Sequence, residues 1–278
     1  MKTSKYLFAS LLGLCWLSAC SHSIVRTHSN LAPASILLVL AHPDDETMIS
    51  EFLTKWHQEG HEVHAIYATA GEGGRVFKGL DGQNQPTFGK LSPSRMSSKR
   101  LKELKKAAKG FHIRKYEVIG APDTPLRDTL ERPSRDVHLF FEKKIWDLSK
   151  IERAITTAAQ TIDPTWIVTM SKDQDTHVHH KAIRNIVESL WNQRKIGTSS
   201  QSLLLAIDEG TRIDETLGTE EKHLWASQTV SLPKAFASSS KIRKHPGPAK
   251  HYKTQMAGYL LEPLQTTQHI YLIDQRAP

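Results

Sequence analysis

Apolar runs alternate with amphipathic stretches along most of the chain. Residues 36–40 are five consecutive large aliphatics, the pattern of a strand buried on both faces of a parallel sheet. A helical period of apolar positions follows from Met48 to Trp56 and stops at Gly60. Similar runs predict further strands at residues 61–69, 116–119, 166–170, 203–207 and 270–273.

Amphipathic segments between these strands predict the helices. They lie at residues 101–110, from about Asp136 to the stop at Asp163-Pro164, at 182–190, and in the tail at 250–261. Residues 71–98 and 208–218 lack a period and are expected to be irregular rims. Alternating strands and helices predict an α/β protein with a Rossmann-like, doubly wound, mostly parallel sheet covered by helices on both faces.

A histidine and three carboxylates follow the first strand directly, as His42-Pro43-Asp44-Asp45-Glu46. In open α/β sheets this strand end is where ligands bind. A histidine and a carboxylate three residues apart can converge on one divalent ion. Asp44 and Asp45 are neighbours and point in different directions, so one can ligate a metal while the other accepts a proton. The alternative is a helix cap, which explains neither His42 nor the second aspartate.

A second polar group follows the strand at residues 166–170. It contains Asp173, Asp175, His177, His179 and His180, at the same edge of the predicted sheet as His42. Taken alone, His177 and His180 could be solvated loop histidines. Together with His42 and Asp45, one of the later histidines would complete a set of two histidines and a carboxylate, the open pattern of catalytic zinc.

The N-terminus has the form of an export signal. Lys2 and Lys5 precede an apolar run at residues 6–16 that is too short to span a bilayer. Leu17-Ser18-Ala19-Cys20 resembles a bacterial lipobox, which implies cleavage before Cys20 and lipidation of that cysteine. The alternative is an ordinary cleaved signal with an incidental cysteine.

These features divide the chain into a lipoprotein signal peptide at 1–19, a lipidated cysteine and tether at 20–35, and one domain at 36–278. We therefore expect an exported, membrane-anchored lipoprotein that faces the periplasm. Ser21, in place of aspartate after the cysteine, points to the outer membrane.

Cysteine content and net charge limit the possible disulfides and binding partners. The two cysteines are Cys15 and Cys20, so no disulfide is possible after cleavage of the signal. The net charge of +8 falls to +6 without Lys2 and Lys5, which favours anionic headgroups or glycans as contacts. A nucleic-acid partner is not expected, because the basic residues form no recognisable binding motif and the chain is exported.

The segment Ala41-His42-Pro43-Asp44-Asp45-Glu46 resembles the signature of the PIG-L/LmbE-like family of zinc-dependent N-deacetylases. Further resemblances follow in order at Thr69–Gly74, Arg100–Leu104, Pro122-Asp123 and Tyr252–Gln255. Members of this family remove acetyl groups from N-acetylglucosaminyl groups of inositol lipids, thiol precursors and glycopeptide antibiotics. The resemblance implies Zn²⁺ as cofactor and an N-acetylated amino sugar or related glycoconjugate of the cell envelope as substrate.

The resemblance also implies roles for individual residues. His42, Asp45 and His180 would be the zinc ligands, and Asp44 the general base that takes a proton from water. His177 would be protonated and would stabilise the tetrahedral intermediate.

Two residues of the rim are candidates for sugar contacts. Asp123 matches a substrate-contacting aspartate of the family, and Arg75 could bind a sugar hydroxyl or be a plain rim residue. One departure concerns the second motif, where His179 replaces the usual aspartate of His-Pro-Asp-His. An imidazole cannot orient a ligand as a carboxylate does, so Asp173 or Asp175 could take that part.

Two other functions stay open at this point. The same zinc site could serve an amidase that cleaves a larger acyl or peptide-like conjugate. A binding lipoprotein could have kept the shell and lost turnover, but a pure binding protein has no need of a free Asp44 carboxylate beside a metal.

Overall fold

The computed structural model describes residues 33–83, 86–124, 136–172, 177–207, 223–229, 248, 251–255 and 267–276. The predicted signal peptide, Cys20, most of the tether and the rim at 208–218 lie outside the described residues. Among the helices of the described part, none is long and apolar enough to cross a membrane.

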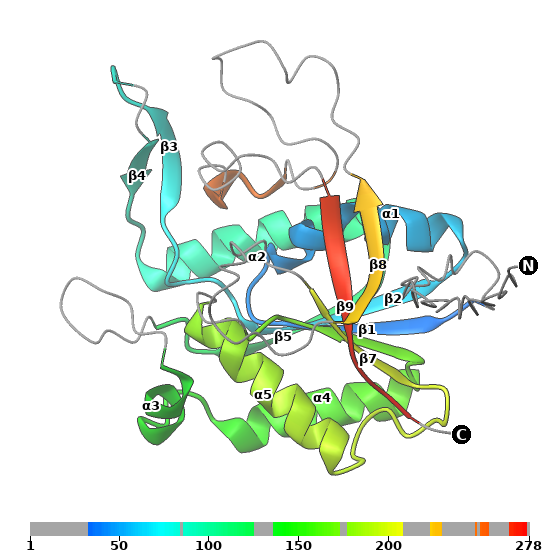
Figure 1. Cartoon of the computed structure of the whole chain (residues 1–278). Helices are drawn as coiled ribbons and strands as arrows, with labels where there is room; N and C mark the ends of the chain where they lie inside the picture. Colours follow the sequence, from blue (N-terminus) through cyan, green and yellow to red (C-terminus); the bar gives the residue numbers. More distant parts are fainter. Residues whose placement is uncertain are drawn as a thin grey trace, which may run out of the picture.

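A seven-stranded sheet forms the centre of the domain (Figure 1). Its strand order is β5-β2-β1-β6-β7-β9-β8, and the first five of these strands are parallel. The parallel strands are β1 (Ser35–Leu40), β2 (Glu62–Thr69), β5 (Ile113–Ala121), β6 (Trp166–Thr169) and β7 (Leu203–Ile207). The antiparallel edge consists of β9 (Thr267–Gln275) and β8 (His223–Thr229).

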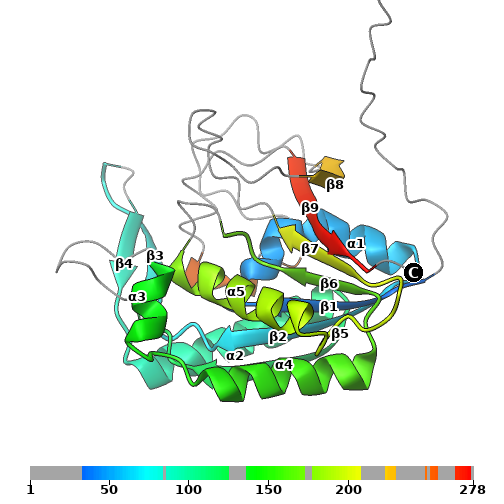
Figure 2. The same ribbon diagram turned by 60° about the horizontal axis from the view of Figure 1, so that its bottom comes forward.

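Helices cover both faces of this sheet. On one side lie the 3₁₀-helix η1 (Asp45–Ile49), α1 (Ser50–Gln58) and α2 (Pro93–Gly110). On the other side lie α3 (Val137–Glu142), α4 (Leu148–Ile162) and α5 (Val178–Asn192), as Figures 1 and 2 show. The predicted α/β class and doubly wound sheet are confirmed.

The apolar run after Ser35 forms the central strand of the core. In the register of the sheet, Leu38 lies between Ala65 of β2 and Val168 of β6. The side chains of residues 36–40 are all fully buried, because helices cover both faces of β1. Truncating one of them, as in Leu37→Ala, is expected to cost about 2–5 kcal/mol of stability.

The strand order reverses beside β1. The chain passes from β1 to β2 and β5 on one side, then returns to β6 on the other side of β1. Such a reversal opens a crevice at the carboxyl ends of the two strands. His42 follows β1 there, and His177 lies between β6 and α5 at the same edge.

The long helix predicted from Asp136 is wrong, since two helices occupy this stretch. Lys144 has a φ of 50°, a left-handed conformation that ends α3. Asp147 then caps α4 by accepting a hydrogen bond from the backbone N–H of Lys150. Between the two helices the indole N–H of Trp146 donates to the carbonyl of Pro122, 3.0 Å away.

The predicted irregular rim at 71–98 is also wrong in part. It contains an antiparallel hairpin of β3 (Val76–Leu80) and β4 (Pro86–Gly89), and α2 already begins at Pro93. Asp81-Gly82 follows β3 directly, and this dipeptide is a turn signal that a search for apolar periods alone does not detect. Strand β8 was not predicted either.

Predictions for the tail have a mixed outcome. The strand at 270–273 is confirmed as part of β9. In the stretch predicted to be helical, the structure describes only residues 251–255, which include the short 3₁₀-helix η4 (Lys253–Gln255). The remainder of that prediction lies outside the described residues.

Candidate active site

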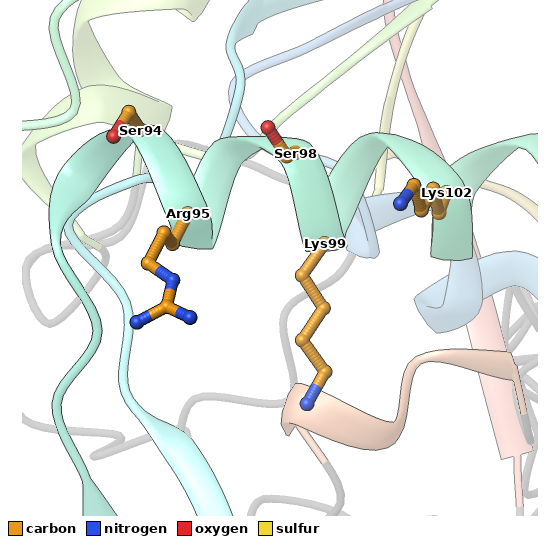
Figure 3. A pocket seen from close by; sticks show the side chains of 5 residues that line it. All are labelled: Ser94, Arg95, Ser98, Lys99 and Lys102. Atoms are coloured by element: carbon orange, nitrogen blue, oxygen red, sulfur yellow. The ribbon is translucent and has the colours of Figure 1, made fainter.

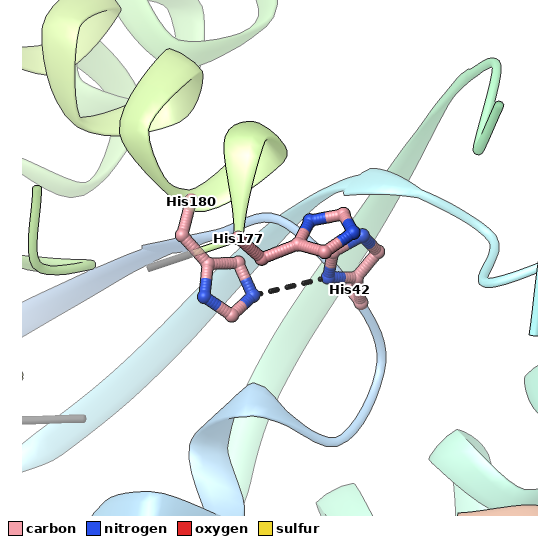
Figure 4. Close-up of side chains that lie close together, drawn as sticks. All are labelled: His42, His177 and His180. Carbon is pink, nitrogen blue, oxygen red and sulfur yellow. Dashed lines mark hydrogen bonds between the residues drawn. The ribbon is translucent and has the colours of Figure 1, made fainter. Parts of the chain in front are cut away.

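Three predicted ligand atoms form a compact triangle at the reversal point. Nδ1 of His42 lies 3.2 Å from Nε2 of His180 and 3.7 Å from Oδ1 of Asp45, and the last two atoms are 3.2 Å apart. Ligands of tetrahedral zinc at bond lengths near 2 Å are about 3.3 Å from one another. The three donors therefore fit zinc. Figure 4 shows His42 facing His180, with His177 beside them.

Asp45 is held in place for this task by its own backbone. Its Oδ2 accepts hydrogen bonds from the N–H groups of Ala41 and His42, at 2.9 and 2.8 Å. Oδ1 is thereby left for a cation. Burial acts to raise the pKa of Asp45, but the contacts with His180 and His42 hold it well below its usual range, so the carboxylate is ionised.

Asp44, next to Asp45 in the chain, has an unusual backbone conformation. Its φ of 117° is a left-handed conformation, which is unfavourable for a residue with a side chain and is tolerated best by aspartate and asparagine. Asp44 occupies the cap position of η1, yet its side chain makes no capping hydrogen bond. The helix-cap interpretation of Asp44 is therefore wrong.

Arg100 of α2 contacts both Asp44 and the turn before it. Its Nη1 lies 3.2 Å from Oδ2 of Asp44 and donates to the carbonyl of Pro43 at 2.8 Å. Burial raises the pKa of Asp44 to about 6, although the charge of Arg100 acts to lower it. Such a carboxylate is ionised at neutral pH and basic enough to accept a proton.

Glu46 fixes the turn from the other side. Its fully buried carboxylate accepts a hydrogen bond from the backbone N–H of Asp44 at 3.2 Å. It also accepts one from the hydroxyl of Tyr252, in the segment before η4. Burial raises the pKa of Glu46 to about 7. The position of Asp44 thus depends on a residue more than two hundred positions away, which no local pattern could reveal.

A second C-terminal contact follows the same plan. The hydroxyl of Thr254 donates to Oε2 of Glu103 at 2.5 Å, and its backbone N–H donates to Oε1 at 3.2 Å. Glu103 lies on α2, three residues after Arg100. The segment at 251–255 therefore packs on η1 and α2, the two elements that position Asp44.

The far side of the His42 ring faces a second group of polar atoms. Nε2 of His42 lies 2.9 Å from Nδ1 of His179 and 3.5 Å from Oδ1 of Asp123. Nδ1 of His179 is also 3.3 Å from that oxygen. A carboxylate next to the outer nitrogen of a ligating histidine fixes its orientation and raises its basicity. Asp123 is placed for this role, whereas Asp173 and Asp175 lie outside the described residues.

The turn after β2 holds Asp123 in position. The backbone N–H of Gly73 donates to Oδ2 of Asp123 at 2.9 Å, and the N–H of Asp123 donates to Oε1 of Glu72 at 2.9 Å. A Cβ on Gly73 would lie 2.1 Å from the carbonyl oxygen of Asp123, so only glycine allows this approach. The glycine-rich turn therefore holds Asp123 against the histidine cluster.

His177 lies at the start of α5, and its ring centroid is 5.1 Å from that of His42. Desolvation and the neighbouring imidazoles lower the pKa of His177 to about 2, so its ring is neutral. The family resemblance instead implies a protonated ring. Its Nδ1 accepts from the backbone N–H of His179 at 3.3 Å. The proton of the neutral ring is thus on Nε2, which can donate a hydrogen bond.

Other donor groups also lie close enough to share an ion. They are His42 with His177 and His180, and His42 with Asp123 and His179; within each group the ligand atoms are no more than 4.8 Å apart. We prefer the triangle with Asp45, because it places an ionised carboxylate and two imidazoles at the spacing of one tetrahedral ion. His177, His179 and Asp123 then surround the metal ligands.

Sequence comparison identifies the family. The profile of the PIG-L family, described as GlcNAc-PI de-N-acetylase, matches residues 37–191. The chain belongs to the PIG-L family. The match spans the signature around His42 and the second motif at 177–180. A comparison with curated proteins gives no match.

Solved structures share the fold of this PIG-L protein at low sequence identity. The A40926 pseudoaglycone deacetylase Dbv21 is 16% identical, with a TM-score of 0.52 over 89% of this chain and 100% of that one. The zinc-inhibited form of teicoplanin deacetylase Orf2 is 14% identical, with a TM-score of 0.52 over 86% and 99%. The likeness to these two deacetylases supports the α/β fold described above.

A third neighbour catalyses a different reaction. GalB, the 4-carboxy-2-hydroxymuconate hydratase from Pseudomonas putida, is 11% identical, with a TM-score of 0.53 over 88% of this chain and 98% of that one. The fold alone therefore does not select the chemistry, and family membership and the site residues must do so.

The predicted residues thus fall into two groups. His42, Asp44, Asp45, Asp123, His177 and His180 come together at one strand edge. Arg75 is exposed, with its guanidinium 6.0 Å from the ring of Phe88 on the hairpin, and no described contact joins it to the histidines. The sequence places Arg100 and Tyr252 in family-like motifs, but only the structure shows their contacts with Asp44 and Glu46.

Proposed function

We propose that this chain is a zinc-dependent hydrolase that removes the acetyl group from an N-acetylated amino sugar or related glycoconjugate of the cell envelope. The proposal builds on membership of the PIG-L family. The observation that carries it is the Asp44 carboxylate, which caps no helix and lies beside an open set of three metal ligands.

His42, Asp45 and His180 would hold the ion. When bound there, zinc would polarise the amide carbonyl and lower the pKa of a water molecule. Asp44 takes the proton of the attacking water, and Arg100 keeps its carboxylate oriented and ionised. Asp44 can return that proton to the amine as the C–N bond breaks, so the cycle leaves acetate and a free amine.

His177 has a different part in this scheme. Its neutral ring carries the proton on Nε2 and would donate a hydrogen bond to the carbonyl oxygen as negative charge develops there. This assignment replaces the imidazolium expected from the sequence. Protonation of the leaving amine is therefore left to Asp44.

Substrate contacts are proposed from the rim. Arg75, directly before the β3–β4 hairpin, is exposed and can reach a sugar hydroxyl or a charged group of a larger glycoconjugate. Asp123 keeps only a small exposed fraction, 11% of its side chain, so a sugar contact there would compete with its contacts to the histidines.

We also propose that the protein is exported and anchored through a lipid on Cys20, facing the periplasm from the outer membrane. The support is the sequence of residues 1–21 alone. An anchored enzyme would meet acetylated glycans of the envelope without leaving the membrane surface.

The proposal is tested by supplying candidate N-acetylated envelope glycans to the chain expressed from Ser21 and loaded with zinc. Mass spectrometry should show the loss of one acetyl group and the release of acetate, both abolished by a chelator. Release of a longer acyl group or a peptide without acetate would make the protein an amidase of another kind. Binding of glycans without any product would make it a binding protein.

A further inference from the structure

Helix α2 carries a continuous basic ridge on its exposed side. Arg95, Lys99, Lys102, Lys105, Lys106 and Lys109 follow one another at spacings of four, three, three, one and three residues. At 100° per residue they lie within an arc of about 120°, along roughly 21 Å of helix. Lys99 is half-buried and the other five are exposed. These six residues are called the α2 ridge below.

Acidic residues are scarce in the stretch of chain that contains the α2 ridge. Residues 77–110 contain nine lysines and arginines, and their only acids are Asp81 in the hairpin turn and Glu103. Glu103 is buried and bonded to Thr254, and none of the six ridge cations forms a salt bridge with a described residue. No salt bridge with a described residue therefore neutralises the ridge.

The first half of the ridge borders a hollow. Ser94, Arg95, Ser98, Lys99 and Lys102 line a pocket of about 350 Å³. Figure 3 shows Arg95 and Lys99 extending from the same side of α2. Two hydroxyls and three cations around one hollow suit an anionic group such as a phosphate.

Exposed apolar side chains lie next to these charges along the chain. Phe88 is 43% exposed, and Leu91 and Leu101 are each 37% exposed. Phe88 belongs to the β3–β4 hairpin, which projects from the body of the domain (Figures 1 and 2), and Leu91 lies between that hairpin and α2. Three of the five exposed large hydrophobic side chains of the described residues thus fall within 88–101.

We propose that the α2 ridge, together with Phe88 and Leu91, is a docking surface for a membrane rich in anionic lipids. Lysines and arginines beside exposed apolar groups are the combination that holds proteins at the headgroup layer. A straight ridge of six cations matches a plane of phosphates better than it matches one small anion. The surface acts separately from a lipid on Cys20 and does not depend on the proposed deacetylation.

Docking through this face would also orient the active site. Arg100, on the same helix, contacts Asp44 from the buried side. The hairpin and α2 connect at Lys90–Ser92, so the rim next to Arg75 would face the lipid headgroups.

The test uses the chain expressed from Ser21, which has no site for lipidation and retains every described element, the first of which begins at Ser35. Binding to vesicles of phosphatidylcholine alone is compared with binding to vesicles containing phosphatidylglycerol. We expect binding to the anionic vesicles at least tenfold tighter and strongly weakened by salt. Equal binding to both vesicles, or no binding to either, would overturn the proposal.

Matched variants separate the ridge from net charge. Lys102→Glu/Lys106→Glu/Lys109→Glu should weaken binding to the anionic vesicles about a hundredfold or more. Lys143→Glu/Lys150→Glu/Lys195→Glu changes the net charge equally at exposed positions outside α2 and should have an effect of less than about threefold. Equal losses in the two triple variants would show attraction by net charge only and would contradict a specific surface.

The apolar part has its own matched pair. Leu91→Ala should weaken vesicle binding several-fold, whereas Leu148→Ala, at an equally exposed leucine at the start of α4, should not. Circular dichroism and the melting temperature of each variant check that it is folded. If folded Leu91→Ala and the folded ridge variant bind like the wild type, the surface is not used for docking.

Discussion

Nη1 of Arg100 lies 3.2 Å from Oδ2 of Asp44, and the same nitrogen donates to the carbonyl just before Asp44. One guanidinium therefore both orients the proposed base and lowers its pKa against the effect of burial. This pair joins α2, the helix after the β3–β4 hairpin, to the turn after β1. A substitution of Arg100 therefore tests the protonation of Asp44.

Replacing Arg100 should change the pH dependence of activity. In Arg100→Gln the pKa of Asp44 should rise above its value of about 6, because the charge that lowers it is gone. Since Asp44 accepts a proton only when ionised, activity at pH 5–6 should fall more than activity at pH 8. The measurement is kcat/KM against pH. Lys105→Gln on the same helix should leave the profile unchanged, and an unshifted profile in Arg100→Gln would refute the pairing.

Asp44 and Asp45 should respond differently to the same substitution. Asp44→Asn keeps the size and tolerates the left-handed backbone, so zinc binding and fold should persist while kcat falls by roughly 10²- to 10⁴-fold. Asp45→Asn removes a charged ligand, so activity and zinc content should fall together and recover partly with excess zinc. Kinetics with parallel metal analysis test the contrast. Wild-type turnover in zinc-loaded Asp44→Asn would remove Asp44 as the base.

Asp123 should affect the metal more than the substrate. Asp123→Asn removes the negative charge that faces Nε2, the outer nitrogen of His42. Zinc affinity should therefore fall by roughly 10- to 100-fold. Competition titration with a zinc-binding dye measures this without any substrate. Arg75→Ala, on the rim, should keep the wild-type affinity. If Asp123→Asn instead binds zinc normally and only KM rises, Asp123 is a sugar contact.

Glu46 should make the stability of the metal-free protein depend on pH. Burial raises its pKa from 4.5 to about 7, so between these values the folded chain keeps a proton that the unfolded chain releases. This stabilisation is complete below about pH 4.5 and is lost as the pH rises through about 7, by at most about 3 kcal/mol. Glu46→Gln should therefore be relatively more stable at pH 8 than at pH 5, compared with the wild type in urea unfolding. Equal differences at both pH values would contradict this.

The proposed anchor gives a prediction outside the described residues. Cys20→Ser should leave a precursor that is misprocessed and carries no lipid label, while the catalytic domain keeps its activity. Labelling with a fatty-acid analogue and fractionation of the envelope measure both effects. Wild-type protein found free in the periplasm without an acyl group would refute the lipobox interpretation.

The sequence by itself determined the layered fold and half of the site. The uninterrupted aliphatic run at 36–40 has one stable location, a strand covered on both faces, and its end must lie at the ligand-binding edge of the sheet. His42, Asp44 and Asp45 follow from that position because they are adjacent in the chain. Only tertiary structure could decide how His42 is shared between Asp45 on one side and Asp123 on the other, since the strands that carry them meet through the sheet order. The contact of Tyr252 with Glu46 belongs to the same class, because a buried carboxyl takes its hydrogen-bond partner from whatever the folded chain brings to it, regardless of sequence distance.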